Sequence, residues 1–374
     1  MTATNPFDCH IILDGIRRWV EIETPTEAPE QVNKLAGIVA DGYRGLPATI
    51  ERISGKNGCG DHLVARSSWG QDAPGILVLS HLDTVHPIGT LATLPFRRDG
   101  SRAWGPGILD MKGGNYLALE AIRQLGRARI GTKLPITMLL TSDEEVGSPS
   151  TRDLIEAEAA RHRYVLVPEP ARADGGVVTG RYAIARFNLE ATGRPSHAGA
   201  RLADGRSAIR EMARKLIEIE DMTTEDCTFS VGVIHGGQWV NCVSTTCTGE
   251  ALSMAKRQED LDRGVAQMLA LSASSNDVQF KVTRGVTRPV WEPDSNVMAL
   301  YETARGIARE LDFDINSQSS GGGSDGNFTG AMGITTLDGL GVGGAGAHTL
   351  DEHIVVESLA YRGKLMAGLL ATLA

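Results

Sequence analysis

Five short motifs rich in acids and histidines stand out in this sequence, because each follows an apolar segment or a turn. They are HLDTV (81–85), GPGILDMKGG (105–114), DEEVG (143–147), PEP (168–170) and GAHT (346–349). Carboxylates that share one crevice repel each other and lose hydration, so they need a cation to remain ionised. Imidazole combined with carboxylate suits zinc, cobalt or manganese better than calcium. The motifs together therefore predict a transition-metal site.

Each motif taken alone has a simpler interpretation as a polar strand end. A single His-x-Asp or Glu-Glu pair is common and carries little information. The recurrence of such motifs at successive strand ends favours the metal site, because ligands collect beyond the carboxyl ends of the strands in an open parallel sheet.

Apolar segments alternating with helical patterns are expected to position these motifs. Strands are predicted at 75–80, 135–142 and 164–170, and helices at 9–20, 30–42, 113–125 and from Thr151 onward. Continuous apolar strands separated by helices are typical of an α/β fold. Its sheet is mixed but mostly parallel, with helices on both faces.

The pattern changes at Arg181, where apolar and polar residues begin to alternate. Strands are predicted at 181–192, 227–235, 243–256 and 278–284, with a helix over about 204–220, and helices at 296–311 and 356–372 close the chain. The order strand, helix, strand, strand, helix, strand predicts an inserted α+β domain of the ferredoxin-like type. We therefore expect a catalytic domain built from residues 1–180 and 289–374, and a dimerisation or lid domain over residues 181–288.

Composition restricts the classes of partner. The chain of 374 residues has 37 Lys+Arg against 46 Asp+Glu, a net charge of −9, which disfavours nucleic acid as a partner. No apolar stretch approaches the ~20 residues that a membrane span needs, and no signal-peptide pattern begins the chain, so we expect no membrane partner and a cytoplasmic location. Five cysteines without a CxxC spacing fit reduced thiols rather than a disulfide frame.

The motifs HLDTVHP, GPGILDMKGG, TSDEEVGS, VPEP, GRPSHAGA and AHTLDEH occur in this order along nearly the whole chain. In this respect the sequence resembles the co-catalytic zinc metallopeptidase family that contains glutamate carboxypeptidases, acetylornithine deacetylase, succinyl-diaminopimelate desuccinylase and aminoacylase. The resemblance implies a hydrolase with two divalent metal ions, zinc first and manganese or cobalt as alternatives. It also implies a small-molecule substrate and a homodimer or higher homo-oligomer formed through the inserted domain.

The resemblance further implies the metal ligands. Asp110 corresponds to the carboxylate that bridges both metals. One metal would also bind His81 and Glu169, and the other Glu145 and His348, which leaves a position for a bridging water.

Three catalytic roles follow from the same resemblance. Asp83 would orient the imidazole of His81, and Glu144 would be the general base. His197, in GRPSHAGA, has the spacing of an ordinary loop histidine, whereas the resemblance implies an oxyanion stabiliser that reaches the partner subunit's active site. The other histidines weighed as ligands match no ligand position and are expected to be structural or exposed: His86, His162, His235 and His353.

The sequence departs from the family at the substrate end. Peptidase members usually carry an arginine on a strand of the inserted domain that clamps the terminal carboxylate of the substrate. Counting from Asn241 places Met254 at that position, and strand alternation puts Lys256 on the same face as a weaker substitute. An asparagine that glutamate carboxypeptidases often have ten residues after the histidine is Ser207 here.

Two interpretations of this departure remain open. Either the strand is misaligned and Arg181, Arg201 or Arg206 supplies the positive charge, or the enzyme no longer cleaves ordinary C-terminal amino acids. The leading function is hydrolysis of the amide of a peptide or N-acyl amino acid. The alternative is hydrolytic deamination of an activated aromatic amine, as in a nitroanthranilate aminohydrolase, which an apolar Met254 would suit. A peptidase-like binding protein would require the loss of the base or of a ligand, and none is lost.

Overall fold

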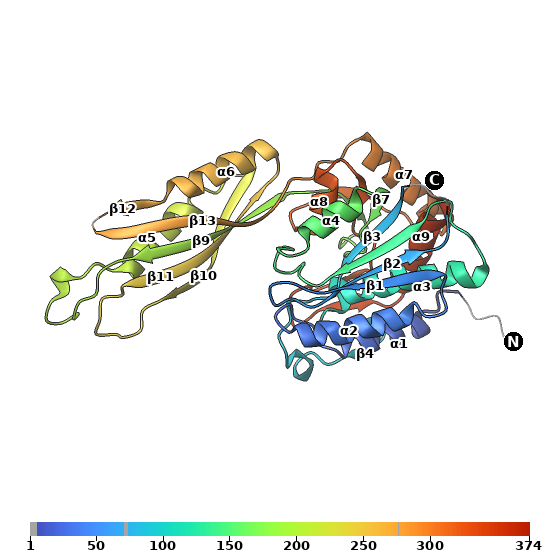
Figure 1. Ribbon diagram of the computed structural model, residues 1–374, viewed down its shortest axis with the longest axis horizontal. Coiled ribbons are helices and arrows are strands. Elements are labelled where there is room, and N and C mark those ends of the chain that lie inside the picture. Colours follow the sequence, from blue (N-terminus) through green and yellow to red (C-terminus); the bar gives the residue numbers. More distant parts are fainter. Residues whose placement is uncertain (1–5, 71–73, 276) are drawn as a thin grey trace. The chain divides into compact units, whose positions relative to one another are not determined.

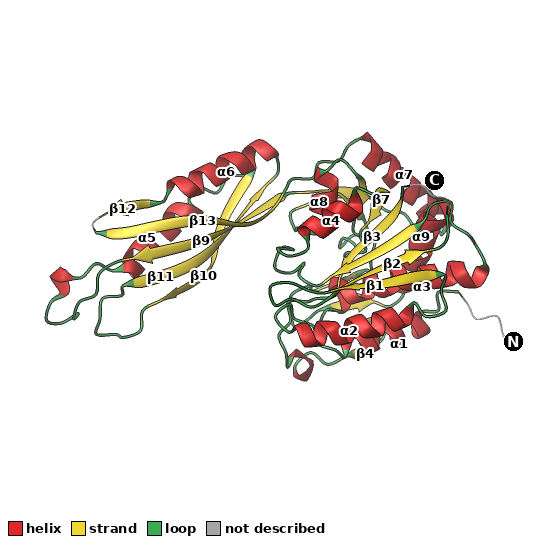
Figure 2. Ribbon diagram, in the orientation of Figure 1, coloured by secondary structure: helices red, strands yellow, loops and turns green. Residues whose placement is uncertain are grey.

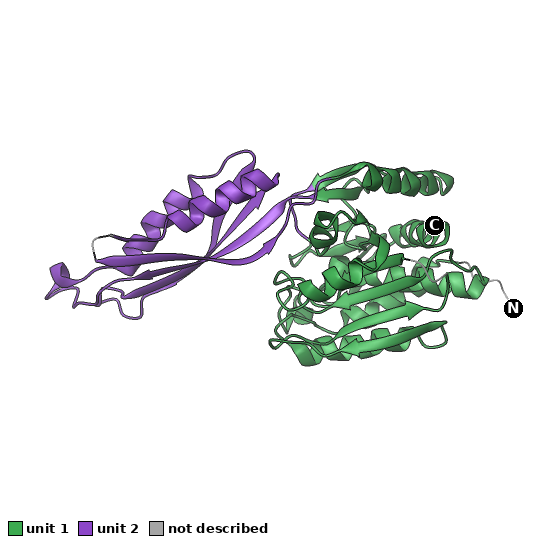
Figure 3. Cartoon of the chain, turned by 45° about the horizontal axis from the view of Figure 1, so that its top comes forward, with its two compact units in different colours: residues 1–180, 293–319, 324–374 green, residues 181–292, 320–323 purple. Residues whose placement is uncertain are grey.

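The structure, a computed structural model, describes residues 6–70, 74–275 and 277–374. The chain divides into two compact units (Figure 3). Unit 1 contains residues 1–180, 293–319 and 324–374, and unit 2 contains residues 181–292 and 320–323. Unit 2 thus ends at Glu292 rather than at residue 288, and it includes the short segment Ser320–Gly323. Among the described residues, no helix has both the length and the apolar composition needed to cross a bilayer.

A six-stranded sheet forms the centre of unit 1 (Figure 1), in the order β1-β2-β6-β3-β7-β15. The strands are β1 Ala48–Ile53, β2 His62–Ser67, β3 Gly75–His81, β6 Ile136–Thr141, β7 His162–Leu166 and β15 Thr335–Leu337. Strands β6, β3, β7 and β15 are parallel, whereas β1 and β2 form an antiparallel pair that extends one edge. The mostly parallel α/β sheet that the sequence predicts is therefore confirmed.

Helices cover both faces of this sheet (Figure 2). They are α1 Cys9–Val20, α2 Pro29–Gly42, α3 Gly113–Ala128, α4 Arg152–Ala159, α7 Ser295–Glu310, α8 Gly326–Ala331 and α9 Ser358–Thr372. Alternate residues of β3 point to opposite faces, as the strand geometry requires. Ile76 and Val78 join the core beneath α1, α2, α3, α7 and α9, whereas Leu77 and Leu79 pack with α4 and α8.

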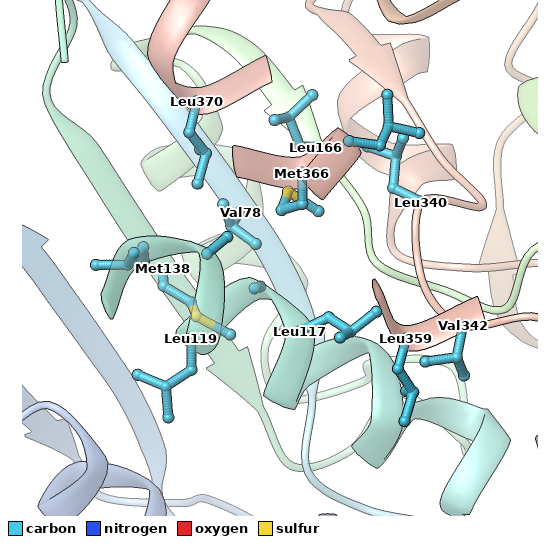
Figure 4. Close-up of a cluster of buried hydrophobic side chains, with 14 of the residues drawn as sticks. Val78, Leu117, Leu119, Met138, Leu166, Leu340, Val342, Leu359, Met366 and Leu370 are labelled. Atoms are coloured by element: carbon cyan, nitrogen blue, oxygen red, sulfur yellow. The ribbon is translucent and has the colours of Figure 1, made fainter. Parts of the chain in front are cut away.

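The larger core holds the sheet and helices together. Val78 and Met138 from the sheet lie close to Leu117 of α3 and to Met366 and Leu370 of α9 (Figure 4), and all five are buried. Burying a side chain of this size contributes about 1.5–3 kcal/mol. The strands that lead to the acidic motifs are consequently anchored in a packed core.

A small antiparallel sheet joins two distant loops of unit 1. Its order is β16-β17-β5-β4, with β16 Gly344–Ala345, β17 His353–Val355, β5 Arg102–Trp104 and β4 Arg97–Asp99. His353 of β17 pairs with Trp104 of β5. Because β5 leads directly into the Asp110 loop and β17 follows the His348 loop, this pairing brings the two loops together. A separate two-stranded sheet pairs β8 Val177–Arg181 with β14 Ser317–Ser320.

Unit 2 is a five-stranded antiparallel sheet with two helices. The strands are β9 Ala183–Thr192, β10 Cys227–Gly236, β11 Thr246–Ala255, β12 Ala273–Ser275 and β13 Val278–Arg288, in the order β10-β11-β9-β13-β12. Helices α5 Ala208–Glu220 and α6 Gln258–Ala270 pack on one face, through residues such as Phe187, Met212 and Leu261. Apart from the short β12, this is the ferredoxin-like arrangement that the sequence predicts.

Candidate metal centre

Parallel strands of the central sheet deliver three of the motifs to one edge. Strand β3 ends at His81, β6 ends just before the 143–147 turn, and β7 is followed by Glu169. The small sheet adds the Asp110 and His348 loops. All five residues predicted as ligands therefore lie within unit 1, in two groups that share Asp110: His81, Asp110 and Glu169, and Asp110, Glu145 and His348. Within each group the candidate ligand atoms lie within 4.8 Å of one another.

His81 is held in one orientation and one tautomer. Its Nδ1 lies 2.9 Å from the main-chain oxygen of Asp83, which can only accept, so Nδ1 carries the proton. The opposite nitrogen, Nε2, is buried and makes no hydrogen bond within the described residues. It faces Asp110 Oδ1 at 3.4 Å and Glu169 Oε1 at 3.6 Å. A lone pair aimed at two carboxylates is unfavourable unless a cation lies between them, so this arrangement fits a metal ligand.

Asp110 has the geometry of a bridging carboxylate. Its Oδ1 faces His81, and its Oδ2 lies 3.2 Å from Nε2 of His348. Nε2 of His348 also lies 3.4 Å from Oε2 of Glu145. Each oxygen of Asp110 thus belongs to a different group. The first group is largely buried, whereas His348 is half exposed, so the second group faces solvent.

The electrostatics of the cluster favour positive charge. Burial, followed by the charge of Asp110, raises the pKa of Glu169 to about 7, and burial also raises the pKa of Glu145. Asp110 and then Glu145 raise the pKa of His348 to about 11. Burial lowers the pKa of His81, but Asp110, Asp83 and Glu169 together raise it well above the ordinary value. The carboxylates of this crevice therefore favour positive charge beside them, which two divalent ions would provide.

Asp83 positions two parts of the site at once. Although its main-chain oxygen accepts from His81, its carboxylate lies 3.4 Å from the same Nδ1. The carboxylate accepts hydrogen bonds from Thr26 Oγ1 at 2.7 Å and from the backbone N–H groups of Glu144 and Glu145 at 3.3 and 3.2 Å. Asp83 consequently fixes the turn that presents Glu144, whose side chain is buried and whose charge acts on His81.

Glu352 is a further buried carboxylate to which the sequence analysis assigned no role. Its Oε1 accepts from the N–H groups of Leu109 and Asp110 at 2.8 and 3.0 Å, and its Oε2 accepts from Gly107 N at 2.9 Å and contacts His86 Nε2 at 2.5 Å. Glu352 therefore joins the loops that carry Asp110, His81 and His348. Its place in AHTLDEH, four residues after a predicted ligand, was the available signal, but burial is not visible in the sequence.

The remaining histidines considered in the sequence are not part of the cluster. His86 is buried against Glu352, and the Nδ1 atoms of His162 and His353 contact the main-chain oxygens of Glu158 and Asp351. His235 lies exposed on β10 in unit 2.

His197 lies in unit 2, in the exposed loop that follows β9. Its Nδ1 accepts hydrogen bonds from the N–H groups of Gly199 and Ala200, both at 3.1 Å. These bonds leave the ring proton on Nε2 of the neutral imidazole. The loop therefore presents an N–H donor outward.

Met254 lies on β11, between Thr228 of β10 and Ile184 of β9, and it is partly exposed. Strand β11 carries no arginine or lysine. Lys256, considered as a substitute, lies beyond the end of the strand, where its Nζ is 3.3 Å from Asp226 and 3.5 Å from Glu225. Lys256 is thus engaged by acidic neighbours.

The other residues considered at the substrate end make local contacts. Arg181 is buried and donates to the main-chain oxygen of Gly322 at 2.6 Å. Ser207 is the N-cap of α5 and accepts from Arg210 N at 3.2 Å. Arg201 pairs with Asp204 at 2.6 Å, and Arg206 donates to the main-chain oxygens of Ala203 and Gly205.

Comparisons with known proteins point to the same family as the sequence motifs do. The model of peptidase family M20/M25/M40 matches residues 77–372. Carboxypeptidase G2 from Pseudomonas sp. (strain RS-16) is 30% identical over 375 residues, covering 97% of this chain and 89% of that protein. Succinyl-diaminopimelate desuccinylase from Thioalkalivibrio sulfidiphilus is 24% identical over 324 residues, covering 81% and 85%. A tripeptidase structure from Staphylococcus aureus shares the fold, with a TM-score of 0.77 and 21% identity over 98% of this chain and 99% of that one.

Proposed function

Because the chain belongs to peptidase family M20/M25/M40, and is thus a metal-dependent hydrolase of C–N bonds, we propose that it uses two metal ions to hydrolyse the amide of a peptide or N-acyl amino acid. The observation that carries this proposal is the position of Asp110, whose two oxygens face two different histidines. A carboxylate in that position suits a pair of ions, with zinc as the first candidate and manganese or cobalt as alternatives.

Two ions at this centre would supply Lewis acidity to the carbonyl group and to the attacking water. His81 and Glu169 would hold one ion, Glu145 and His348 the other, and Asp110 both. Glu144 would take the proton of the attacking water and deliver it to the leaving nitrogen. The buried position of Glu144 and its fixed turn support this role, because a positioned base needs a defined orientation.

Chelation followed by reconstitution tests the proposal. The purified protein, stripped of metal and then loaded with zinc, manganese or cobalt, is assayed against a panel of N-acyl amino acids and dipeptides. We expect hydrolysis only in the reloaded samples. Full hydrolysis by a sample free of metal by elemental analysis would contradict the proposal.

A second candidate activity is the hydrolytic deamination of an activated aromatic amine. It is favoured by Met254, because an apolar side chain there suits a flat ring better than the carboxylate of a peptide terminus. The engaged positions of Lys256, Arg201 and Arg206 support the same reading, since each already has a partner in its own neighbourhood. Including amino-aromatic acids in the panel distinguishes the two activities.

We also propose that unit 2 forms a homodimer. Strand β10 is an edge strand of the described sheet, and its C-terminal half exposes Val233 and Ile234. The neighbouring helix α5 exposes Ile209 and Ile217. An open edge with apolar side chains is suited to pairing with a second copy. His197 would then donate a hydrogen bond from its Nε2–H group to the oxyanion in the partner's site.

A further inference from the structure

A cavity of about 610 Å³ in unit 1 lies beside His348. It is formed by two loops: residues 85–93, which follow His81, and residues 348–350. The first loop begins four residues after His81 and the second begins at His348, and both histidines belong to the candidate metal centre. We propose that this cavity, here named the apolar subsite, binds an uncharged aliphatic or aromatic group next to the bond that is cleaved. The inference rests on the proposed hydrolysis and narrows its substrate class.

Large apolar side chains line the apolar subsite and are exposed to solvent. Val85 is 40% exposed, Ile88 57% and Leu350 62%. Such side chains come from both loops, so they face a common space instead of lying scattered over the surface. An apolar group that covered them would remove this surface from water, which is favourable in proportion to the area covered.

The apolar subsite lacks the side chains that most often bind charged groups. Its ten lining residues, all of them described by the structure, include no Lys, Arg, Asp or Glu. One of the two lining histidines, His86, is only 5% exposed and is held by Glu352. The other, His348, is directed at Asp110 and Glu145. A carboxylate placed against these two loops would lose its hydration and would find no Lys or Arg side chain in the lining.

The hydroxyl groups of the lining are also occupied. Thr90 donates to Pro87 O at 2.7 Å, Thr93 donates to Thr90 O at 3.0 Å, and Thr349 donates to Gly346 O at 2.7 Å. Each hydroxyl proton is therefore used within the protein, and an anionic ligand finds no hydroxyl donor among these residues. An uncharged apolar group loses nothing from this arrangement.

The position of His348 links the apolar subsite to the reaction. His348 lines the cavity and also belongs to the group that contains Asp110 and Glu145. A group in the cavity consequently lies next to the carbon or nitrogen of the bond under attack. The charge and size of that group should therefore affect kcat/KM more strongly than distant parts of the substrate do.

The test uses metal-loaded protein and two substrate series. One series varies the acyl group (acetyl, hexanoyl, benzoyl, succinyl) on a fixed amino acid, and the other varies the amino acid (Gly, Leu, Phe, Glu) under a fixed acetyl group. Each buried methylene is worth about two- to fourfold in a partly open cavity. In at least one series we expect the apolar members to exceed the smallest and the charged members by about 10- to 100-fold in kcat/KM.

Ile88→Asp and Leu350→Asp, which lie on different loops, should each reduce the kcat/KM advantage of apolar over small or charged substrates at least tenfold. The zinc content, measured by elemental analysis, should stay unchanged. Ile11→Asp is the matched control, because Ile11 is 58% exposed on α1 and lies outside the cavity lining. An apolar preference that survives both variants, or a preference for succinyl and Glu members, overturns the inference.

A binding measurement separates this inference from the proposed function. Calorimetry with hexanoate, acetate and succinate does not require hydrolysis. We expect hexanoate to bind at least tenfold more tightly than acetate or succinate, and to lose this advantage in Leu350→Asp. If no substrate is hydrolysed but hexanoate shows this behaviour, the proposed amide hydrolysis fails and the apolar subsite stands. Equal binding of the three acids overturns the apolar subsite.

Discussion

Replacing Glu352 by glutamine should weaken metal binding without removing a ligand. The two oxygens of Glu352 each serve a pair of groups, Leu109 N and Asp110 N on one side and Gly107 N and His86 on the other. Glutamine keeps one acceptor oxygen and replaces the other by an NH₂ group. One pair therefore keeps its acceptor, while the other pair faces a donor.

The size of the effect follows from these contacts. With the new NH₂ group on the side of Gly107 and His86, His86 can change tautomer and accept from it. The lasting loss is then about one backbone hydrogen bond, that from Gly107 N to a charged acceptor. Such a bond contributes about 1.5–3 kcal/mol. This bond holds the Asp110 loop in the conformation that binds metal. Its loss should therefore lower the affinity for metal about 10- to 100-fold, since about 1.4 kcal/mol corresponds to a factor of ten. Glu352→Ala removes all acceptors and should cost about 3–5 kcal/mol of stability.

Two measurements test this reasoning. Competition with a chromogenic chelator gives zinc affinity, and hydrogen exchange gives the protection of the amides at residues 107–110. Both should fall in Glu352→Gln and remain unchanged in Glu357→Gln, a control at an exposed glutamate five positions later. Wild-type affinity together with wild-type exchange in Glu352→Gln would refute the positioning role.

Three further outcomes are expected. Glu144→Gln should keep its metals and lose about two to four orders of magnitude in kcat, as expected for a general base; metal loss, measured by elemental analysis, would instead make Glu144 a ligand. Inactive His197→Ala and inactive Glu144→Gln subunits, mixed under conditions of proven exchange, should regain activity, and none would appear if His197 acted within its own chain. Met254→Arg should lower kcat/KM on the native substrate, because it places a charge where an uncharged side chain now lies; efficient wild-type cleavage of C-terminal Glu conjugates would contradict this.

The sequence was sufficient for the family and for the main sheet. Peptidase family membership and the mostly parallel α/β fold are both confirmed. They could be predicted because continuous apolar strands and strand-end motifs are local features of the sequence. The antiparallel β1–β2 pair was not predicted. Strand β1 has an almost wholly exposed pattern, so it lacks the apolar signal that marked β3 and β6.

Contacts between distant loops were beyond the reach of the sequence. The roles of Glu352 and His86 depend on a pairing across 266 positions, which no spacing rule describes. Lys256, suggested by strand alternation as a weaker substitute for the missing arginine, lies just beyond β11, which ends at Ala255. Its contacts with Asp226 and Glu225 were not visible in the sequence. The ligand roles of the five central residues remain predictions that the geometry makes more specific.

The most direct test of the two-metal account is a count of metal ions per chain, by native mass spectrometry, measured together with turnover during zinc titration of the stripped protein. The account predicts two ions in the wild type, with amide hydrolysis rising as the second ion binds. It predicts one ion in Glu169→Ala, one in His348→Ala, and weakened binding of both in Asp110→Ala. Full turnover with one ion or none, or two tightly bound ions in Asp110→Ala, would contradict it.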